Sequence, residues 1–151
     1  MAQYYFLDSS AILKRYLAEQ GSRYIGELLN EPDAVFYIAQ IAAVEVASAL
    51  TRQSLNKQIS KRRVQTALAQ FRGDRADIYR VVAVTDPLIE YAMQLAQTHA
   101  LRAYDAIQLA TVLTIAKHVT SLTVTFVCAD ELLNKVAHSE GLAIENPNHH
   151  N

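Results

Sequence analysis

The chain has 151 residues, of which 51% are hydrophobic and 19% charged, and its formal net charge at pH 7 is -1. This length predicts one globular domain that can bury a core without staples, and the high apolar content suggests a permanent partner. This net charge excludes a protein that coats nucleic acid through a large excess of positive charge. A local basic groove is still possible, because it need not change the net charge.

The single cysteine and the first residues of the chain bear on its compartment. Cys128 cannot form an internal disulfide, and we expect it to be a small core residue. Residues 1–3 lack the basic start and apolar stretch of a signal peptide, and the longest weakly polar run, residues 106–116, is too short to span a bilayer. We therefore expect a cytoplasmic protein without a membrane span.

The first predicted element is a buried strand at residues 4–7, which are four bulky apolar residues in a row. It ends at Asp8, and Ser9 and Ser10 offer capping side chains before a helix at residues 11–17. Open α/β sheets hold their ligands at the carboxyl ends of such strands. Asp8 alone is also explained as a helix cap, so a functional role depends on other acids reaching the same point.

A short helix at residues 23–30 and a buried strand at residues 34–38 follow. The next helix, residues 41–50, is apolar almost all round, so we expect it to be packed on several sides. Its only charge is Glu45, and a buried glutamate costs free energy unless it is paired, hydrogen-bonded or bound to a metal. Glu45 therefore faces a solvated edge, pairs with an arginine such as Arg52, or belongs to a site.

A basic stretch comes next, and it contains no acid. It is interpreted as a helical hairpin in which Ser60 caps a second helix that Gly73 and Asp74 end. A cluster of positive charges can bind the backbone of a polyanion. A solvated helix face explains the same cluster. The five cations, which are the candidate RNA contacts, are Arg52, Lys57, Lys61, Arg62 and Arg63.

The third predicted strand is residues 78–84, and the helix after it starts at Thr85 or Asp86, where Asp86 is most simply a cap. Asp105 then lies in the first turn of a helix whose following residues are apolar on nearly every side. That helix belongs in the core, where an unpaired charge at its start is costly. A cap explains Asp105 too.

The last part of the chain repeats the opening pattern. A buried strand from residue 122 stops at Asp130, which is again explained as a cap when taken alone, and a helix follows at residues 131–138. A short strand at residues 142–145 completes the domain, which we place at residues 1–147. Residues 148–151 are expected to be a disordered tail, and its histidines receive no metal role.

Strands alternate with helices throughout, which predicts an α/β fold: a three-layer α/β/α sandwich around a central parallel sheet. Right-handed crossovers bring the carboxyl ends of the strands, and the helix starts that follow them, to one edge. Asp8, Asp105 and Asp130 then share this rim, and Glu45 could lean into it.

Carboxylates in a small space repel one another and take up protons unless cations hold the ionised forms. Oxygen ligands select Mg²⁺ or Mn²⁺, and no histidine or cysteine lies in these segments at the spacing of a zinc site. A carboxylate-held ion of this kind suits phosphate chemistry, because it lowers the pKa of a bound water and offsets charge on phosphoryl oxygens.

Four short motifs, in this order and at these intervals, resemble the acidic motifs of PIN-domain ribonucleases, especially VapC-like toxins of bacterial type II toxin-antitoxin pairs. The resemblance extends from Tyr4 to Pro147. The motifs are Leu7-Asp8-Ser9-Ser10, Val44-Glu45-Val46, Tyr104-Asp105-Ala106 and Ala129-Asp130-Glu131.

The resemblance implies that Asp8, Glu45, Asp105 and Asp130 are catalytic acids that bind Mg²⁺ or Mn²⁺. Ser10 would be the polar helper, at a position where the family often has threonine. The implied activity is hydrolysis of single-stranded RNA that leaves a 5′-phosphate and a 3′-hydroxyl. The implied partners are a cognate antitoxin and a second copy of the chain, and we expect the apolar first helices, around Ile12, Tyr16 and Ile25, to supply surface for them.

Other protein classes begin in a similar way. A haloacid-dehalogenase-type phosphatase needs a second acid two residues after the first, where this chain has Ser10. A receiver-type signalling module needs paired acids after the first strand, which Ser9 and Ser10 do not supply. A non-catalytic PIN-like interaction module remains an alternative; such modules usually lose one or more of the acids, and this chain has all four.

Overall fold

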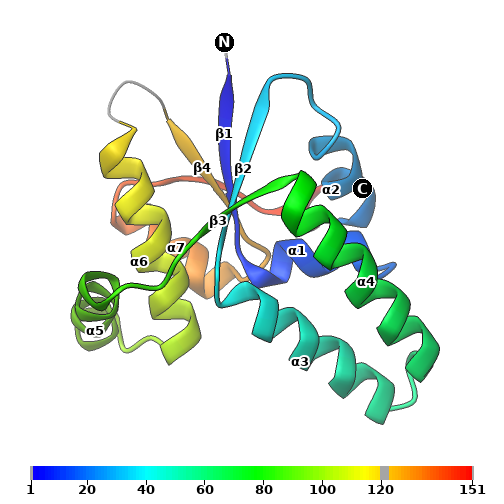
Figure 1. Cartoon of the computed structure of the whole chain (residues 1–151). Helices are drawn as coiled ribbons and strands as arrows, with labels where there is room; N and C mark the ends of the chain where they lie inside the picture. Colours follow the sequence, from blue (N-terminus) through cyan, green and yellow to red (C-terminus); the bar gives the residue numbers. More distant parts are fainter. Residues whose placement is uncertain (1, 120–122, 151) are drawn as a thin grey trace.

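Five parallel strands form one sheet in the order β3-β2-β1-β4-β5 (Figure 1). The computed structural model describes residues 2–119 and 123–150, so Leu122, where we expected the fourth strand to begin, lies outside the described residues. Central strand β1 pairs with β2 on one side and β4 on the other, and Tyr5 lies opposite both Phe36 and Thr125. The strands are β1 (Gln3–Leu7), β2 (Ala34–Ala39), β3 (Tyr79–Val82), β4 (Val124–Val127) and β5 (Ala143–Glu145).

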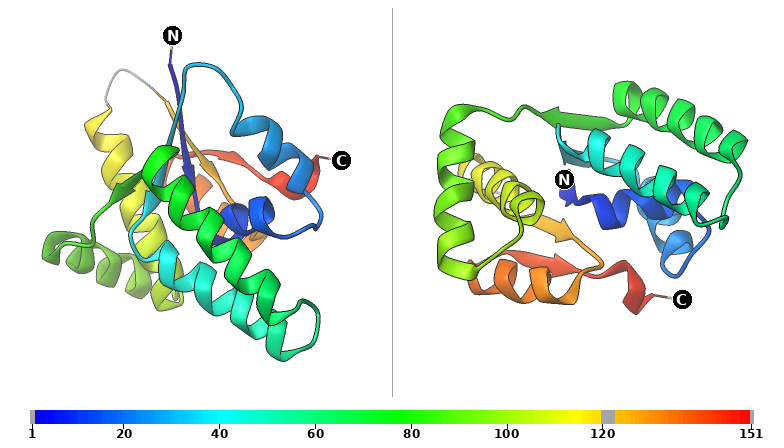
Figure 2. Two further views of the ribbon diagram at one scale, coloured as in Figure 1. Left: turned by 45° about the vertical axis from the view of Figure 1, so that its right-hand side comes forward. Right: turned by 90° about the horizontal axis from the view of Figure 1, so that it is seen from below.

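The helices cover both faces of the sheet (Figure 2). Alternate side chains of β1 explain the two layers: Tyr5 and Leu7 enter one core, and Phe6 enters the other. One layer holds α1 (Ser9–Tyr16), α2 (Ser22–Leu28), α3 (Ala42–Leu55) and α4 (Lys61–Asp77); the other holds α5 (Asp86–His99), α6 (Ala103–His118) and α7 (Glu131–Ser139). The predicted three-layer sandwich is confirmed.

Helix α4 is longer than predicted, because it runs through Gly73 and Asp74 to Asp77. The Asp74 carboxylate accepts hydrogen bonds from Arg15 Nε and from the Tyr16 hydroxyl, both at 2.7 Å. A glycine inside a helix costs about 1 kcal/mol, which this network can offset. The expectation that Gly73 and Asp74 end the helix was therefore wrong.

Helix α3 is buried along one stripe, whereas the sequence predicted packing on several sides. Ala42, Val46 and Leu50 form this stripe, and Val44 is 62% exposed. The apolar residues of the first helices are also accounted for within the chain, since Ile12 and Ile25 are fully buried in its own core. These residues do not supply partner surface, so the expectation that they do was wrong.

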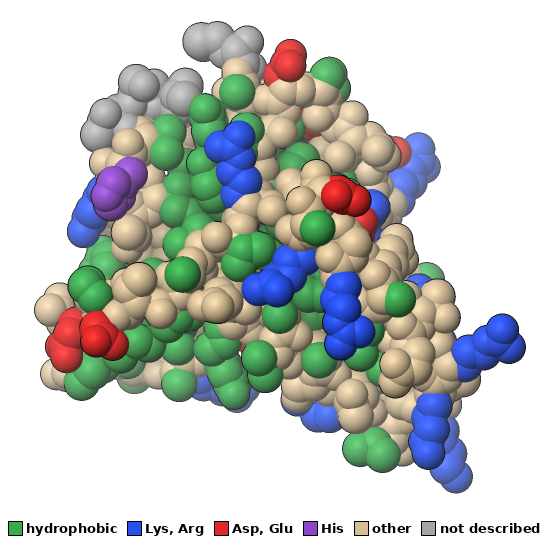
Figure 3. All heavy atoms as spheres, in the orientation of Figure 1, with side chains coloured by type: hydrophobic (Ala, Val, Ile, Leu, Met, Phe, Trp, Pro, Cys, Tyr) green, Lys and Arg blue, Asp and Glu red, His purple; other side chains and the backbone are tan. Residues whose placement is uncertain are grey.

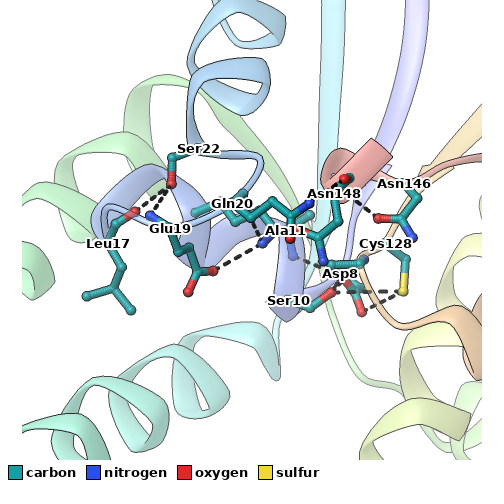
Figure 4. Close-up of polar contacts among 12 residues, drawn as sticks. Asp8, Ser10, Ala11, Leu17, Glu19, Gln20, Ser22, Cys128, Asn146 and Asn148 are labelled. Carbon is teal, nitrogen blue, oxygen red and sulfur yellow. Dashed lines mark hydrogen bonds and ion pairs between the residues drawn. The ribbon is translucent and has the colours of Figure 1, made fainter. Parts of the chain in front are cut away.

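The C-terminal residues pack against the start of α2. The 3₁₀ turn η1 (Pro147–His149) is followed by His150, whose ring stacks on Tyr24 with a centroid distance of 3.8 Å. Gln20 donates a hydrogen bond to the Asn148 carbonyl at 2.8 Å (Figure 4). Residues 148–150 therefore differ from the expected disordered tail, and residue 151 lies outside the described residues.

None of the helices in the described ranges is long and apolar enough to cross a bilayer.

Candidate active site

Asp8 is both a helix cap and a buried acid. Its Oδ1 accepts hydrogen bonds from the Ala11 amide at 3.1 Å and the Ser10 hydroxyl at 2.6 Å, and its Oδ2 accepts one from the Cys128 thiol at 3.2 Å (Figure 4). The residue is only 5% exposed. Burial raises the pKa of Asp8 to about 6 against the lowering effect of these hydrogen bonds, and the charge of Glu45 raises it slightly more.

Ser10 and Cys128 connect Asp8 to the loop after β4. The Ser10 hydroxyl, which donates to Asp8, accepts a hydrogen bond from the Ala129 amide at 3.0 Å. The Cys128 sulfur accepts one from the Asp130 amide at 3.3 Å. The ends of the adjacent parallel strands β1 and β4 are thus joined by side chains, and Asp8 and Asp130 lie at the same rim of the sheet.

Asp105 and Asp130 line a cavity of about 500 Å³ at this rim, together with Arg102 and Lys135. Asp130 caps α7, since its Oδ1 accepts from the Leu133 amide at 3.0 Å. Burial raises the pKa of Asp105, and the charges of Asp130 and Glu45 raise it further, while Arg102 opposes them.

Glu45 lies in the first turn of α3 and accepts a hydrogen bond from Gln108 Nε2 at 2.9 Å. Arg52 is not its partner; this side chain donates to the Ser48 hydroxyl at 2.7 Å. Glu45, Arg52, Ser10 and Tyr104 line a second cavity, of about 290 Å³. The four predicted acids therefore lie at one rim. Glu45 faces one cavity, Asp105 and Asp130 face the neighbouring one, and Asp8 is buried.

Sequence reasoning missed Gln108, which is 1% exposed in the middle of α6. Its amide donates to Glu45 and also to the Ser9 hydroxyl at 3.0 Å, while its own Oε1 has no partner among the described residues. The signal that could have revealed Gln108 is its polar amide, which lies one turn after Asp105 in a mostly apolar helix.

The chemistry of the four acids fits a hard divalent cation, because all their donors are oxygens. A cation would also offset the burial and the neighbouring negative charges that raise the pKa of Asp105. Within residues 2–119 and 123–150, however, no three side chains of the Asp, Glu, His and Cys types are placed to hold an ion together. Side-chain rotation is needed to bring three carboxylates to one point.

The five predicted cations do not share one environment. Arg52 lines the cavity that contains Glu45, and Arg63 donates a hydrogen bond to the Tyr16 carbonyl, which makes Arg63 part of the fold. The remaining three, Lys57, Lys61 and Arg62, are exposed at and beyond the turn between α3 and α4. Lys and Arg side chains project from that end of the molecule, at the lower right (Figure 3).

Residues 5–137 match the model of the PIN domain family, so the chain belongs to this family. PIN domains are typically nucleases and generally use divalent metals, which supports a hydrolase acting on nucleic acid. A comparison with curated protein sequences finds no match.

Solved structures share the fold over nearly the whole chain. FitAcB from Neisseria gonorrhoeae is 19% identical with a TM-score of 0.65, and the match covers 97% of this chain and 99% of that one. VapBC2 from Rickettsia felis, bound to a DNA fragment from its promoter, is 15% identical with a TM-score of 0.65 and coverages of 95% and 98%. A toxin-antitoxin complex from Klebsiella pneumoniae is 16% identical with a TM-score of 0.55 and coverages of 94% and 96%.

Proposed function

We propose that this protein is a metal-dependent endoribonuclease that hydrolyses phosphodiester bonds of single-stranded RNA and serves as the toxin of a toxin-antitoxin pair. The observation that carries the proposal is the position of Asp8, Glu45, Asp105 and Asp130 at one rim of the sheet in a PIN-family chain. The predicted products are a 5′-phosphate and a 3′-hydroxyl.

The four acids would hold Mg²⁺ or Mn²⁺, which supplies electrostatic stabilisation of the phosphoryl oxygens and a water of lowered pKa. Ser10 keeps the Asp8 carboxylate oriented through its 2.6 Å hydrogen bond. Gln108 does the same for Glu45. Arg52 lies beside Glu45 and provides a positive charge for the RNA backbone.

The proposed partners follow from the structural neighbours. One neighbour is described as a toxin-antitoxin complex, and another is VapBC2 bound to promoter DNA. These descriptions support a cognate antitoxin for the present chain. A homodimer and a cytoplasmic location remain part of the proposal as well.

One observation favours a different class, a non-catalytic PIN-like interaction module. This observation is the lack of three converging metal ligands in the described part of the chain. The presence of all four acids argues against this class. Burial raises the pKa of Asp8 to about 6, and shifted carboxyl groups of this kind are common at active sites. Family membership leaves no support for the phosphatase alternative.

An RNA cleavage assay separates the two classes. The purified protein, incubated with end-labelled single-stranded RNA and Mn²⁺ or Mg²⁺, should cleave it, and EDTA or Asp8→Asn should abolish cleavage. Asp86→Asn is the matched control, because Asp86 also opens a helix after a strand yet is exposed and lines neither cavity. Cleavage that survives EDTA contradicts the metal-dependent mechanism, and no cleavage of any RNA favours the interaction module.

A further inference from the structure

The two cavities that the acids face meet at the start of α6. Tyr104 lines the cavity that contains Glu45, and the next residue, Asp105, lines the cavity that contains Asp130. One turn of helix therefore forms the boundary between them. A chain molecule that entered one cavity and continued into the other would pass over this turn and over the acids.

Positive charges lie on both sides of the boundary. Arg52 belongs to the first cavity, and Arg102 and Lys135 belong to the second. None of these three forms an ion pair with an acid anywhere in residues 2–119 and 123–150. These cations are placed for phosphates on either side of the acids.

Exposed apolar side chains gather along the same path. Val44 and Tyr104 on the first cavity are 62% and 52% exposed, and Leu132 on the second is 75% exposed. Single exposed apolar side chains are ordinary on protein surfaces, but a group of them beside a cavity marks an interaction site, and these three lie beside the acids. Proteins that hold single-stranded nucleic acid combine cations along the backbone path with aromatic faces on which bases stack.

We infer that the two cavities form one track for single-stranded RNA, with Tyr104 as a base-stacking platform beside the scissile phosphate. Arg52 on one side, and Arg102 with Lys135 on the other, contact the flanking phosphates. This inference rests on the proposed function and deepens it, because it assigns residues that bind the substrate on both sides of the acids. The cations on both sides favour a polyanion over a protein as the occupant.

Binding is measured with a fluorescent single-stranded RNA of about eight nucleotides, which is within the usual site size, and with the Asp8→Asn chain, so that cleavage does not interfere. Tyr104→Ala should weaken binding by about 5- to 150-fold, since stacking contributes that much per base, and Tyr104→Phe should keep it. An RNA with an abasic position beside the cleavage point should bind Tyr104→Ala as tightly as it binds the chain with Tyr104.

The cations are tested through salt dependence. Arg102→Gln and Lys135→Gln should each reduce the slope of log affinity against log salt by about 0.7, the value for one single-strand phosphate contact. Lys117→Gln is the matched control, because Lys117 lies in the last turn of α6, at the other end of the helix from Tyr104. It should leave affinity and slope unchanged.

Two results would overturn the inference while leaving the proposed function intact. The first is a parent chain that cleaves RNA while the Tyr104 and Arg102 variants bind RNA as tightly as their parent. The second is a set of variants that weaken only the binding of a protein inhibitor, which would assign the cavities to a protein interface. If the parent chain neither binds nor cleaves RNA, both the track and the proposed function are wrong.

Discussion

Gln108 in α6 and Glu45 in α3 are joined by a hydrogen bond of 2.9 Å. Because Gln108 and Asp105 are three residues apart on α6, they lie on the same face of this helix. One buried helix therefore carries an acid of the candidate site and the amide that orients another. The position of Glu45 depends on this bond, since Arg52, the cation that lines the same cavity, is bonded to Ser48 instead.

Replacing Gln108 should reduce activity through Glu45. We predict that Gln108→Leu lowers kcat/KM by about 10- to 150-fold, because a hydrogen bond to a charged group contributes about 1.5 to 3 kcal/mol. Calorimetry should also show weaker Mn²⁺ binding. Thr111→Val is the matched control, since Thr111 is buried one turn later and its hydroxyl donates to the Ile107 carbonyl of its own helix. If Gln108→Leu costs as much activity in a Glu45→Gln background as in the parent, Gln108 does not act through Glu45.

The raised pKa of Asp8 makes stability depend on pH. Between the ordinary value of 3.8 and about 6, the folded chain keeps a proton on Asp8 that the unfolded chain has released. The free energy of unfolding therefore falls as the pH rises through this window, and ionised Asp8 leaves a penalty of up to about 3 kcal/mol at neutral pH.

Asp8→Asn removes this penalty while keeping a capping side chain. We predict that it raises the free energy of unfolding by about 1 to 3 kcal/mol at pH 7.5 in EDTA, and has little effect at pH 4. Urea denaturation at the two pH values measures the difference. If Asp8→Asn instead lowers the free energy of unfolding equally at both pH values, the ionised Asp8 carboxylate carries no penalty in the folded protein.

Divalent cations should stabilise the folded chain, because the pKa of Asp105 is raised by burial and by the charges of Asp130 and Glu45, and a bound cation offsets both effects. At a Mn²⁺ concentration of 100 times Kd, the free energy of unfolding should rise by about 2.7 kcal/mol. Thermal denaturation with and without EDTA measures this rise. Asp105→Asn should remove most of it and Asp86→Asn none; equal responses of the two variants would place the ion elsewhere.

Two glycines near α2 should respond to alanine in opposite directions. Gly21 has a φ of +84°, and a Cβ there would lie 2.8 Å from the Pro147 carbonyl oxygen, so Gly21→Ala should destabilise the chain by about 1 to 2 kcal/mol or more. Gly26 lies inside α2 with nothing within 4 Å of its added Cβ, and Gly26→Ala should stabilise by about 0.5 to 1 kcal/mol. Chemical denaturation measures both changes. The loss in Gly21→Ala tests whether the C-terminal turn packs against Gly21, and Gly26→Ala is the comparison.

The sequence predicted the layers and the rim because these depend on local patterns. Strands of apolar residues end at Asp8 and near Asp130, and parallel order then brings both to one edge. The continuation of α4 through Gly73 could not be predicted, since it involves contacts of Asp74 with Arg15, far away in the sequence. The capping residue Ser60 indicated where α4 starts, whereas the end of this helix depends on the contact of Asp74 with Arg15.

Side-chain contacts within the site were equally beyond the sequence. Nothing in the α6 sequence says that Gln108 reaches both Ser9 and Glu45, which lie on two other helices. The apolar residues of α3 gave no indication of which of its faces is buried, so the helix was expected to pack on several sides, whereas Val44 is exposed beside Glu45. The five basic residues could be counted, but only the fold separates Arg63, which is bonded to Tyr16, from Arg52 at the cavity.

The most direct test of the proposed chemistry is sequencing of the RNA ends that the purified protein produces with Mn²⁺ or Mg²⁺, beside Asp8→Asn and an EDTA control. We predict internal cuts that carry a 5′-phosphate and a 3′-hydroxyl, and that are absent from both controls. Cuts of the same yield with Asp8→Asn, in a chain shown to be folded by its denaturation curve, would contradict the assignment of the catalytic acids.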